Sequence, residues 1–376
     1  MQIVVNTRLL LKDRLEGIGW FTYQTLKRIT QNNPNVHFVF LFDRAFDEEF
    51  IFSDNITPVS LSPMARHPFL YYAWFQFSVK NLLKNMQPDL FLSPDGFLCL
   101  GAGCRQLPVI HDINFLHYPK DLKWLTGKYY NHYFPKFAKE ATRIATVSEY
   151  SKKDLATRYQ VDPGKIDVVY NGINDFFKPV DEKNRQSTKN KYTAGADYFL
   201  FVGSLHPRKN IVSLVKAFSL FKKASSANLK LVLAGPVYWG VREINQVVAE
   251  NNMAAEVIFT GRLSNDELAL VMGSAFALTF IPYYEGFGIP LVEAMAAHIP
   301  LITSKVTSLP EVAGDAALLV DPFEINEIKE AMLQLYNNNS LRQDLIAKGN
   351  IQKLKFSWDK SADLLWQSVT RSVSQG

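Results

Sequence analysis

The sequence predicts an α/β protein of two doubly wound domains, each with a parallel sheet covered by helices. Short apolar runs rich in Val, Ile and Phe alternate with longer amphipathic stretches, and this pattern is typical of strands buried on both faces and joined by helical crossovers. The pattern starts again after a polar segment at 177–190. The length of 376 residues is also more than one domain usually holds.

The first domain, residues 1–176, is expected to contain six strands with helices between them. The strand-like runs are Ile3–Asn6, His37–Phe42, Leu90–Ser93, Val109–His111, Ile144–Val147 and Val168–Tyr170. The helix-like segments are Ile18–Ile29, Tyr72–Met86, Leu125–Lys139 and Tyr150–Tyr159.

The second domain, residues 177–355, repeats this organisation after the polar connection. Its strand-like runs are Phe199–Val202, Leu231–Ala234, Val257–Thr260, Ala277–Ile281, Leu301–Thr303 and Leu318–Val320. The tail, residues 356–376, is expected to form a last amphipathic helix. The sequence does not decide which domain this helix packs on, and a return to the N-terminal domain is one alternative.

Composition narrows the class of protein. With 47% hydrophobic and 20% charged residues, the chain is typical of globular proteins and unlike disordered, collagen-like or low-complexity ones. No apolar run approaches the roughly 18 residues of a membrane span, and the N-terminus opens on a strand pattern without a basic leader. Two cysteines, Cys99 and Cys104, favour free thiols in a reducing compartment. We therefore expect a cytoplasmic protein.

A net charge of +5 is compatible with an anionic substrate, a membrane surface or nucleic acid. Nucleic acid is the least supported partner, because no dense basic tract with interleaved aromatic residues is present. Segment 66–84 combines aromatic residues with Lys80 and Lys84. It is interpreted as a buried helix, as the lining of an acceptor site, or as a helix on the inner face of an anionic membrane.

The most informative segment follows the predicted strand 277–281. Gly286 and Gly288 lie in the loop, Glu285 lies at the end of the strand, and Glu293 lies early in the next helix. Glycines let the backbone approach a ligand, and free N–H groups at a helix start suit phosphate oxygens. A carboxylate can accept two hydrogen bonds from a sugar or ribose diol. A glycine turn with a capping Glu is the alternative that spacing alone leaves open.

Segment Glu285–Gly288 with Glu293 resembles the paired-glutamate signature of retaining GT-B glycosyltransferases of family four, the group 1 glycosyltransferases. Further segments resemble this family in the expected order: Glu16–Gly19, Val109–Asp112, Thr146–Ser151, Val169–Ile173, Phe201–Asn210, Leu233–Pro236, Thr260–Leu263 and Ala313–Ala317. The resemblance covers nearly the whole chain. It implies the GT-B fold, which has two doubly wound parallel-sheet Rossmann-like domains facing a central cleft.

The resemblance implies that the second domain binds a nucleotide-sugar donor. Glu285 would contact the hydroxyls of the donor sugar, and Glu293 would hold the ribose. The backbone of the glycine loop and of the segment after the third strand would complete the donor site, through Phe287, Gly288, Ile289, Arg262 and Leu263.

Cations are expected at the donor diphosphate, because fixed positive charge lowers the barrier to breaking the sugar–phosphate bond. By resemblance, Lys209 would supply this charge, and Arg208 would either add a planar fork or point elsewhere. Many relatives carry Arg directly after the glycine of this segment, where this chain has Ser204. Lys209 is therefore the more secure assignment.

In the first domain, the resemblance implies that His111 touches the sugar near its reacting face. Asp112 would orient His111 or cap the next helix. Gly17 would let the acceptor and the donor diphosphate approach the backbone. The glycine pair could also belong to a dinucleotide-binding oxidoreductase with Asp43 as its acid, but Thr22 stands where that fingerprint needs another small residue.

The resulting prediction is a retaining, metal-independent hexosyltransferase with His111, Glu285 and Lys209 as its catalytic residues. The chain has no Asp-x-Asp at a strand end and no zinc-like His/Cys spacing, so we expect neither a metal nor a cofactor. Mannose from GDP-mannose is the first candidate donor, and a saccharide or lipid-linked molecule is the acceptor. The alternatives are a nucleotide-sugar epimerase, a glycogen-synthase-like enzyme, or a catalytically silent glycan-binding module.

Overall fold

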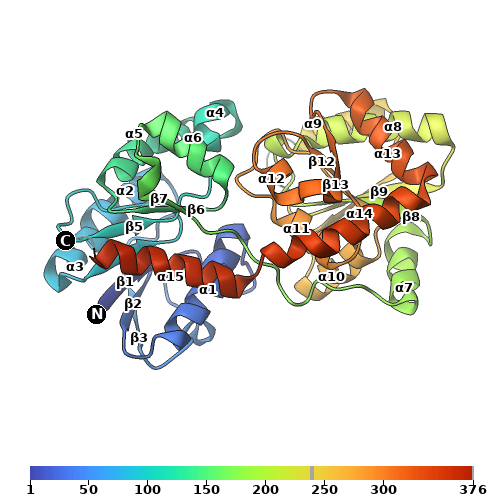
Figure 1. The fold of residues 1–376 in the computed structure, drawn as a ribbon. Helices are drawn as coiled ribbons and strands as arrows, with labels where there is room; N and C mark the ends of the chain where they lie inside the picture. Colours follow the sequence, from blue (N-terminus) through green and yellow to red (C-terminus); the bar gives the residue numbers. More distant parts are fainter. Residues whose placement is uncertain (238–240, 375–376) are drawn as a thin grey trace. The chain divides into compact units, whose positions relative to one another are not determined.

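The computed structural model describes residues 1–237 and 241–374. It divides into two compact units (Figure 1). Unit 1 consists of Met1–Gly172 and Ser357–Gly376, and unit 2 consists of Ile173–Phe356. Among the described helices, none has both the length and the apolar character needed to cross a bilayer.

Unit 1 is built on a parallel sheet with the strand order β3-β2-β1-β4-β5. A parallel pair, β6-β7, lies next to it through a bridge between Val109 and Ala145. The strands are β1 (Gln2–Asn6), β2 (His37–Phe42), β3 (Ile56–Ser60), β4 (Leu90–Ser93), β5 (Gln106–Pro108), β6 (Ile144–Thr146) and β7 (Ile166–Val168).

Helices cover this sheet. They are α1 (Gly17–Asn32), α2 (Pro68–Ala73), α3 (Lys80–Met86), α4 (Asn114–His117), α5 (Trp124–Glu140), α6 (Glu149–Tyr159) and α15 (Trp358–Ser374). A π-helical segment, η2 (Trp74–Val79), joins α2 to α3, so 68–86 is helical throughout. Three short 3-10 turns complete the unit: η1 (Glu48–Phe50), η3 (Pro119–Asp121) and η4 (Pro163–Lys165).

The structure differs from the predicted strands of this unit in three places. Strand β3 was not predicted, because it lies at the sheet edge, is half-exposed and contains Pro58. The run Val109–His111 follows β5 instead of forming it, and only Val109 makes a strand-like bridge. Strand β7 lies two residues before the predicted run Val168–Tyr170. Short apolar runs locate such strands only to within a few residues.

The C-terminal helix α15 belongs to unit 1 and lies beside α1 (Figure 1). Trp358 packs edge-to-face on Phe21, with ring centroids 6.4 Å apart, and Trp366 packs on Phe38 at 6.5 Å. These aromatic contacts bury its apolar side against the first sheet and its helices.

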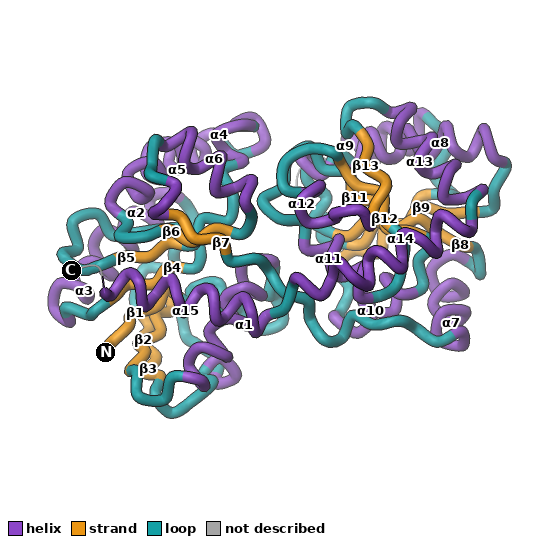
Figure 2. Tube along the Cα trace, viewed as in Figure 1, coloured by secondary structure: helices purple, strands orange, loops and turns teal. Residues whose placement is uncertain are grey.

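Unit 2 is a six-stranded parallel sheet with the order β10-β9-β8-β11-β12-β13. Its strands, orange in Figure 2, are flanked by helices. The strands are β8 (Asp197–Val202), β9 (Leu229–Ala234), β10 (Val257–Gly261), β11 (Ala277–Phe280), β12 (Leu301–Ser304) and β13 (Ala317–Val320).

Longer helices and short turns connect these strands. The helices are α7 (Glu182–Thr193), α8 (Ile211–Ser225), α9 (Val241–Glu250), α10 (Asn265–Gly273), α11 (Ile289–Ala296), α12 (Leu309–Ala313), α13 (Ile325–Asn337) and α14 (Asn339–Gln352). The 3-10 turns are η5 (Pro207–Lys209), η6 (Gly314–Ala316) and η7 (Lys353–Lys355).

Each sheet has a point at which the strand order reverses. In unit 1 it lies between β1 and β4, and in unit 2 between β8 and β11. At such a point the connections leave toward opposite faces of the sheet, and a crevice forms at the carboxyl ends of the two strands. Segments after β1, β4, β8 and β11 are therefore the places to look for a ligand site.

Candidate active site

The site in unit 2 is built from the segments that follow β8 and β11. After β8 the chain turns through η5, whose N-cap is His206. The backbone N–H of Tyr283, after β11, donates to the carbonyl of Arg208 at 3.1 Å. This hydrogen bond joins the two segments, so that the side chains of Arg208 and Lys209 reach Glu285.

Glu285 is buried and accepts hydrogen bonds at Oε1 from both Arg208 Nη1 and Lys209 Nζ. Burial alone would raise the pKa of Glu285, but the charges and hydrogen bonds of Arg208 and Lys209 outweigh it and lower this pKa. The carboxylate is therefore ionised, and two cations share it. Two cations beside one carboxylate form a cluster that suits an anionic ligand.

Two expectations from the sequence are sharpened here. Arg208 does not point elsewhere: it turns to the same carboxylate as Lys209 and also donates to the carbonyl of Tyr284 at 3.2 Å. The sequence separates Glu285 and Lys209 into a sugar end and a phosphate end, whereas the structure places them in contact. The residue expected to bind the sugar and the residue expected to bind the phosphate are therefore in direct contact.

The glycine loop after Glu285 ends in α11. Gly288 is the N-cap and has φ +97°, and a Cβ there would lie 2.6 Å from Leu309 Cδ2, so only glycine fits. Phe287 is buried against Phe356, with ring centroids 5.5 Å apart. The first N–H groups of a helix, here beginning at Ile289, have no partner within the helix and can hold phosphate oxygens.

Glu293, on α11, is a buried carboxyl group of a different kind. Within residues 1–237 and 241–374, no hydrogen bond or ion pair to its carboxyl is found, and burial raises its pKa to about 8. Buried polar groups in proteins are almost always hydrogen-bonded. A bound diol would supply the partner, since a protonated carboxyl can both donate and accept.

Arg262 and Leu263 lie at the carboxyl end of β10, in the turn before α10. Arg262 is exposed and Leu263 is half-buried. A capping box between Ser264 and Glu267 fixes the start of α10 and therefore the path of this turn. The turn lies at the same sheet edge as the segments after β8 and β11.

In unit 1, His111 follows β5 and its Nε2 lies 2.9 Å from the carbonyl of Pro94. Because a carbonyl can only accept, Nε2 carries the proton and Nδ1 is an acceptor when the ring is neutral. Burial lowers the pKa of His111 to about 4, although this hydrogen bond and Asp95 oppose the shift, so the imidazole is neutral at physiological pH. Asp112 accepts from the N–H of Asn114 at 3.0 Å, at the start of α4, while Pro94 fixes the imidazole.

Gly17, also in unit 1, is the first residue of α1. Its N-cap, Glu16, makes no side-chain capping bond. Helix α1 begins at Gly17, directly after the loop that follows β1, which is the position expected for the glycine pair of this segment.

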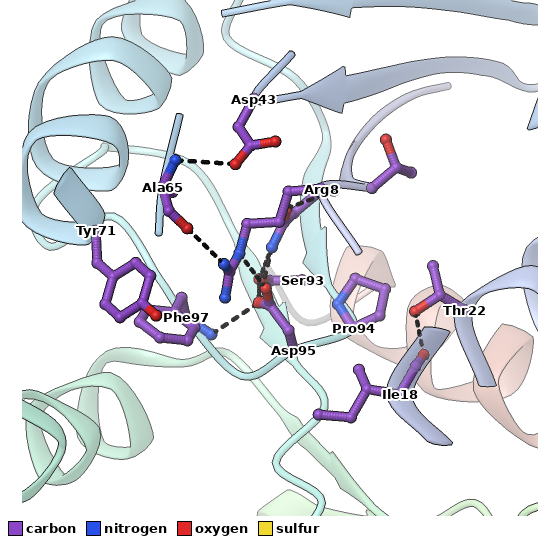
Figure 3. A network of polar contacts seen from close by, with 12 residues as sticks. Arg8, Ile18, Thr22, Asp43, Ala65, Tyr71, Ser93, Pro94, Asp95 and Phe97 are labelled. Carbon is purple, nitrogen blue, oxygen red and sulfur yellow. Dashed lines mark hydrogen bonds and ion pairs between the residues drawn. The ribbon is translucent and has the colours of Figure 1, made fainter. Parts of the chain in front are cut away.

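The sequence motifs did not identify a buried network at the switch point of unit 1 (Figure 3). Arg8 Nε donates to Asp95 at 2.6 Å, and Asp95 also accepts from Asn6 Nδ2 at 2.7 Å. The guanidinium of Arg8 lies 4.8 Å from the ring centroid of Phe97 and donates to the carbonyl of Ala65 at 3.1 Å. The available signal was positional: polar residues directly follow the first and fourth strands of the sheet.

The described part of the chain contains no group of three or more His, Cys, Asp or Glu side chains placed to hold a metal ion. The two cysteines, Cys99 and Cys104, are both free. In unit 2, Arg208, Lys209 and Glu285 form a buried or partly buried cluster of charged side chains.

Comparison with known proteins finds relatives in sequence and in fold. O-antigen chain mannosyltransferase B of Escherichia coli is 28% identical over 260 residues, which is 68% of this chain and 67% of the relative. O-antigen chain mannosyltransferase RfbU of Salmonella typhimurium is 29% identical over 71% of this chain and 70% of the relative. The fold matches that of sucrose-phosphate synthase from Thermosynechococcus elongatus over the whole of both chains, with a TM-score of 0.80 and 18% identity.

Two family models together match residues 15–352 of the chain. The model of Glycosyltransferase Family 4 matches residues 15–175, and that of Glycosyl transferases group 1 matches residues 152–352. The second match contains the segments after β8 and β11, and the first contains His111. The chain therefore belongs to the group 1 glycosyltransferases and is a glycosyltransferase of the GT-B fold.

Proposed function

We propose that the enzyme transfers a hexose from a nucleotide sugar to a saccharide or lipid-linked acceptor, with retention of configuration and without a metal ion. Mannose from GDP-mannose is the first candidate donor. The two O-antigen chain mannosyltransferases support this choice of sugar and an acceptor that is a growing saccharide. The free thiols of Cys99 and Cys104 fit a cytoplasmic location.

The observation that carries the proposal is the pair of cations, Arg208 and Lys209, held beside Glu285. When the bond between the anomeric carbon and the diphosphate oxygen breaks, its electron pair passes to the diphosphate. Arg208 and Lys209, fixed by their contacts to Glu285 and Tyr284, would stabilise this growing negative charge. These cations supply the neutralisation that a divalent ion would otherwise provide. The acceptor hydroxyl forms the new bond to the anomeric carbon, and its proton would pass to the departing diphosphate oxygen.

The two glutamates would divide the remaining work. Glu285 would orient the hydroxyls of the sugar while the two cations balance its charge. Glu293, with its pKa near 8, would be mostly protonated at neutral pH and would bind the ribose diol through an O–H donor and a carbonyl acceptor. His111, neutral and fixed by Pro94, would contact the sugar as an uncharged acceptor.

Thermal unfolding in the presence of nucleotides tests the donor class. GDP, UDP, ADP and dTDP are compared, with NAD as the control for a dinucleotide-binding oxidoreductase. A ligand at 100 times its Kd adds roughly 2.7 kcal/mol, which raises the Tm of a chain of this size by a few degrees. Stabilisation by NAD alone would refute the proposal. Stabilisation by UDP without GDP would replace mannose by another hexose.

Turnover then separates an enzyme of this kind from a silent glycan-binding module. Purified protein is expected to hydrolyse the donor slowly and to transfer its sugar when a saccharide acceptor is added. We expect both rates to survive EDTA, and the NMR coupling of the product to show the anomeric configuration of the donor. Loss of all turnover in EDTA with recovery in Mg²⁺ or Mn²⁺ would contradict metal independence.

A further inference from the structure

The helical segment 68–86 of unit 1 carries aromatic side chains on its outer side. Phe69, Tyr72 and Phe77 are 69%, 40% and 56% exposed, and we call these three the aromatic face. The opposite side of the same segment is already packed, because Trp74 and Leu83 are fully buried in the core of the unit. The aromatic face therefore lies outside the buried core of unit 1.

Helix α5 lies against this segment and continues the surface. The rings of Tyr72 and Tyr133 are 5.9 Å apart. Outward on α5, Lys128, His132 and Lys136 recur at every fourth residue and are exposed, and we call these three the basic face. Lys136 lies 5.5 Å from the ring centroid of Tyr133, so the basic face borders the aromatic face directly.

The charge of this surface is mainly positive. No Asp or Glu occurs between Arg66 and Pro88, and on α5 the sole carboxylate is that of its last residue, Glu140. Lys84 adds a further exposed cation on the helical segment. At the other end of α5, Trp124 is 69% exposed, and Lys128 lies 3.9 Å from its ring centroid.

Aromatic side chains that border several cations, with one carboxylate at the end of α5, match the interface of an anionic bilayer. Phe inserts at the boundary of the acyl chains, Tyr and Trp lie at the level of the headgroups, and Lys pairs with the lipid phosphates. Protein–protein interfaces are usually depleted of lysine, whereas lysines border the aromatic side chains here. Nucleic acid would be expected to meet a denser basic groove.

We propose that the aromatic and basic faces together dock unit 1 on an anionic lipid surface. Docking is peripheral, because the side chains enter the interface and no described helix spans the bilayer. It would bring the enzyme to a lipid-linked acceptor, but it does not depend on the identity of the donor.

Flotation of the full-length protein with vesicles tests the proposal. Vesicles of phosphatidylcholine alone are compared with vesicles that also contain phosphatidylglycerol, and binding is expected mainly to the anionic ones and to weaken as salt is added. Lys128→Gln with Lys136→Gln should weaken binding about 30-fold, which corresponds to roughly 1 kcal/mol for each cation at an anionic surface. Phe69→Ser with Phe77→Ser should abolish binding that remains at high salt.

The matched control removes the same kinds of side chain from unit 2. Lys348→Gln with Ile351→Ser changes one exposed cation and one exposed apolar residue on α14 and should bind vesicles as the wild type does. Cooperative thermal unfolding at the Tm of the wild type confirms that each variant is folded. Equal vesicle binding by all variants, equal loss in the control, or binding of a single-stranded oligonucleotide in place of vesicles would overturn the proposal.

Discussion

At the switch point of unit 1 one cation, Arg8, meets one carboxylate, Asp95, whereas at that of unit 2 two cations, Arg208 and Lys209, share the carboxylate of Glu285. Both groups lie at the carboxyl ends of the two central strands of a parallel sheet. The same topology thus holds one cation on a carboxylate in one unit and two cations on a carboxylate in the other.

The two edges also differ in how completely their polar groups are satisfied. Asp95 accepts from Arg8, from Asn6 and, at 3.1 Å, from the hydroxyl of Ser93. The Glu293 carboxyl, at the edge of unit 2, has no partner in the described part of the chain. The difference teaches that a fully hydrogen-bonded ion pair mainly maintains the fold, while a cluster of two cations and a buried carboxyl group without a hydrogen-bond partner are features that favour ligand binding.

The largest effect is expected from breaking the network of unit 1. Asp95→Asn leaves the buried guanidinium of Arg8 without its counter-ion, which typically costs about 3–5 kcal/mol. The urea midpoint should fall accordingly, whereas the exposed control Asp54→Asn should leave it unchanged. A midpoint equal to that of the control would mean that Arg8 and Asp95 do not stabilise unit 1.

Lys209→Met gives unit 2 the one-to-one charge balance of unit 1, since Arg208 remains on Glu285. If the positive charge of Lys209 drives departure of the diphosphate, kcat should fall by about 10²–10³-fold. The folded state should be retained, because the apolar stem of the side chain is kept. Lys348→Met, on the exposed side of α14, is the matched control. A kcat within a few-fold of the control would assign the catalytic charge elsewhere.

Glu285→Gln sharpens the comparison in the opposite direction, because it frees both cations. The carboxylate competes with phosphate for Arg208 and Lys209, so the variant should bind the free nucleoside diphosphate about tenfold more tightly, or roughly 1.4 kcal/mol. Transfer should nevertheless fall, since the sugar loses the group that orients it. Calorimetry of GDP, or of whichever nucleotide stabilises the protein, measures the affinity. Unchanged or weaker binding relative to the exposed control Glu327→Gln would show that the carboxylate does not oppose phosphate.

The smallest expected effect is a dependence of the stability on pH, in which Glu293 and His111 act over different pH ranges. The pKa of Glu293 is raised from 4.5 to about 8 in the folded state. The folded state thus holds more protons than the unfolded state between these pH values, and stability falls as pH rises, by at most about 1.4 kcal/mol per pH unit.

His111 acts in the other direction, because its pKa is lowered from 6.5 to about 4. Its contribution to stability is complete above pH 6.5 and is lost as the pH falls through 4. Between pH 6.5 and 8 the slope therefore belongs to Glu293. Glu293→Gln should flatten the urea midpoint across this window. A slope unchanged in the variant would mean that Glu293 is ionised in the folded protein.

Much of the candidate site could be predicted from local sequence. These features all lie within a dozen residues: Glu285 precedes the loop with Gly286 and Gly288, and Glu293 lies within the helix that follows the loop. Such features depend on short-range preferences, such as glycine at a positive φ. The direction of Arg208 could not be predicted, because its partners Tyr284 and Glu285 are 76 and 77 residues away.

The sequence by itself determined the class of fold, the order of most strands and helices, and the family, because apolar periodicity and motif order are written along the chain. Tertiary structure alone decided which charges meet. Arg8 and Asp95 are 87 residues apart and come together because β1 and β4 are neighbours in the sheet. It also decided that α15 packs in unit 1 and that Glu293 stays protonated near neutral pH. Burial and long-range pairing set these properties, and neither is encoded in the spacing of residues.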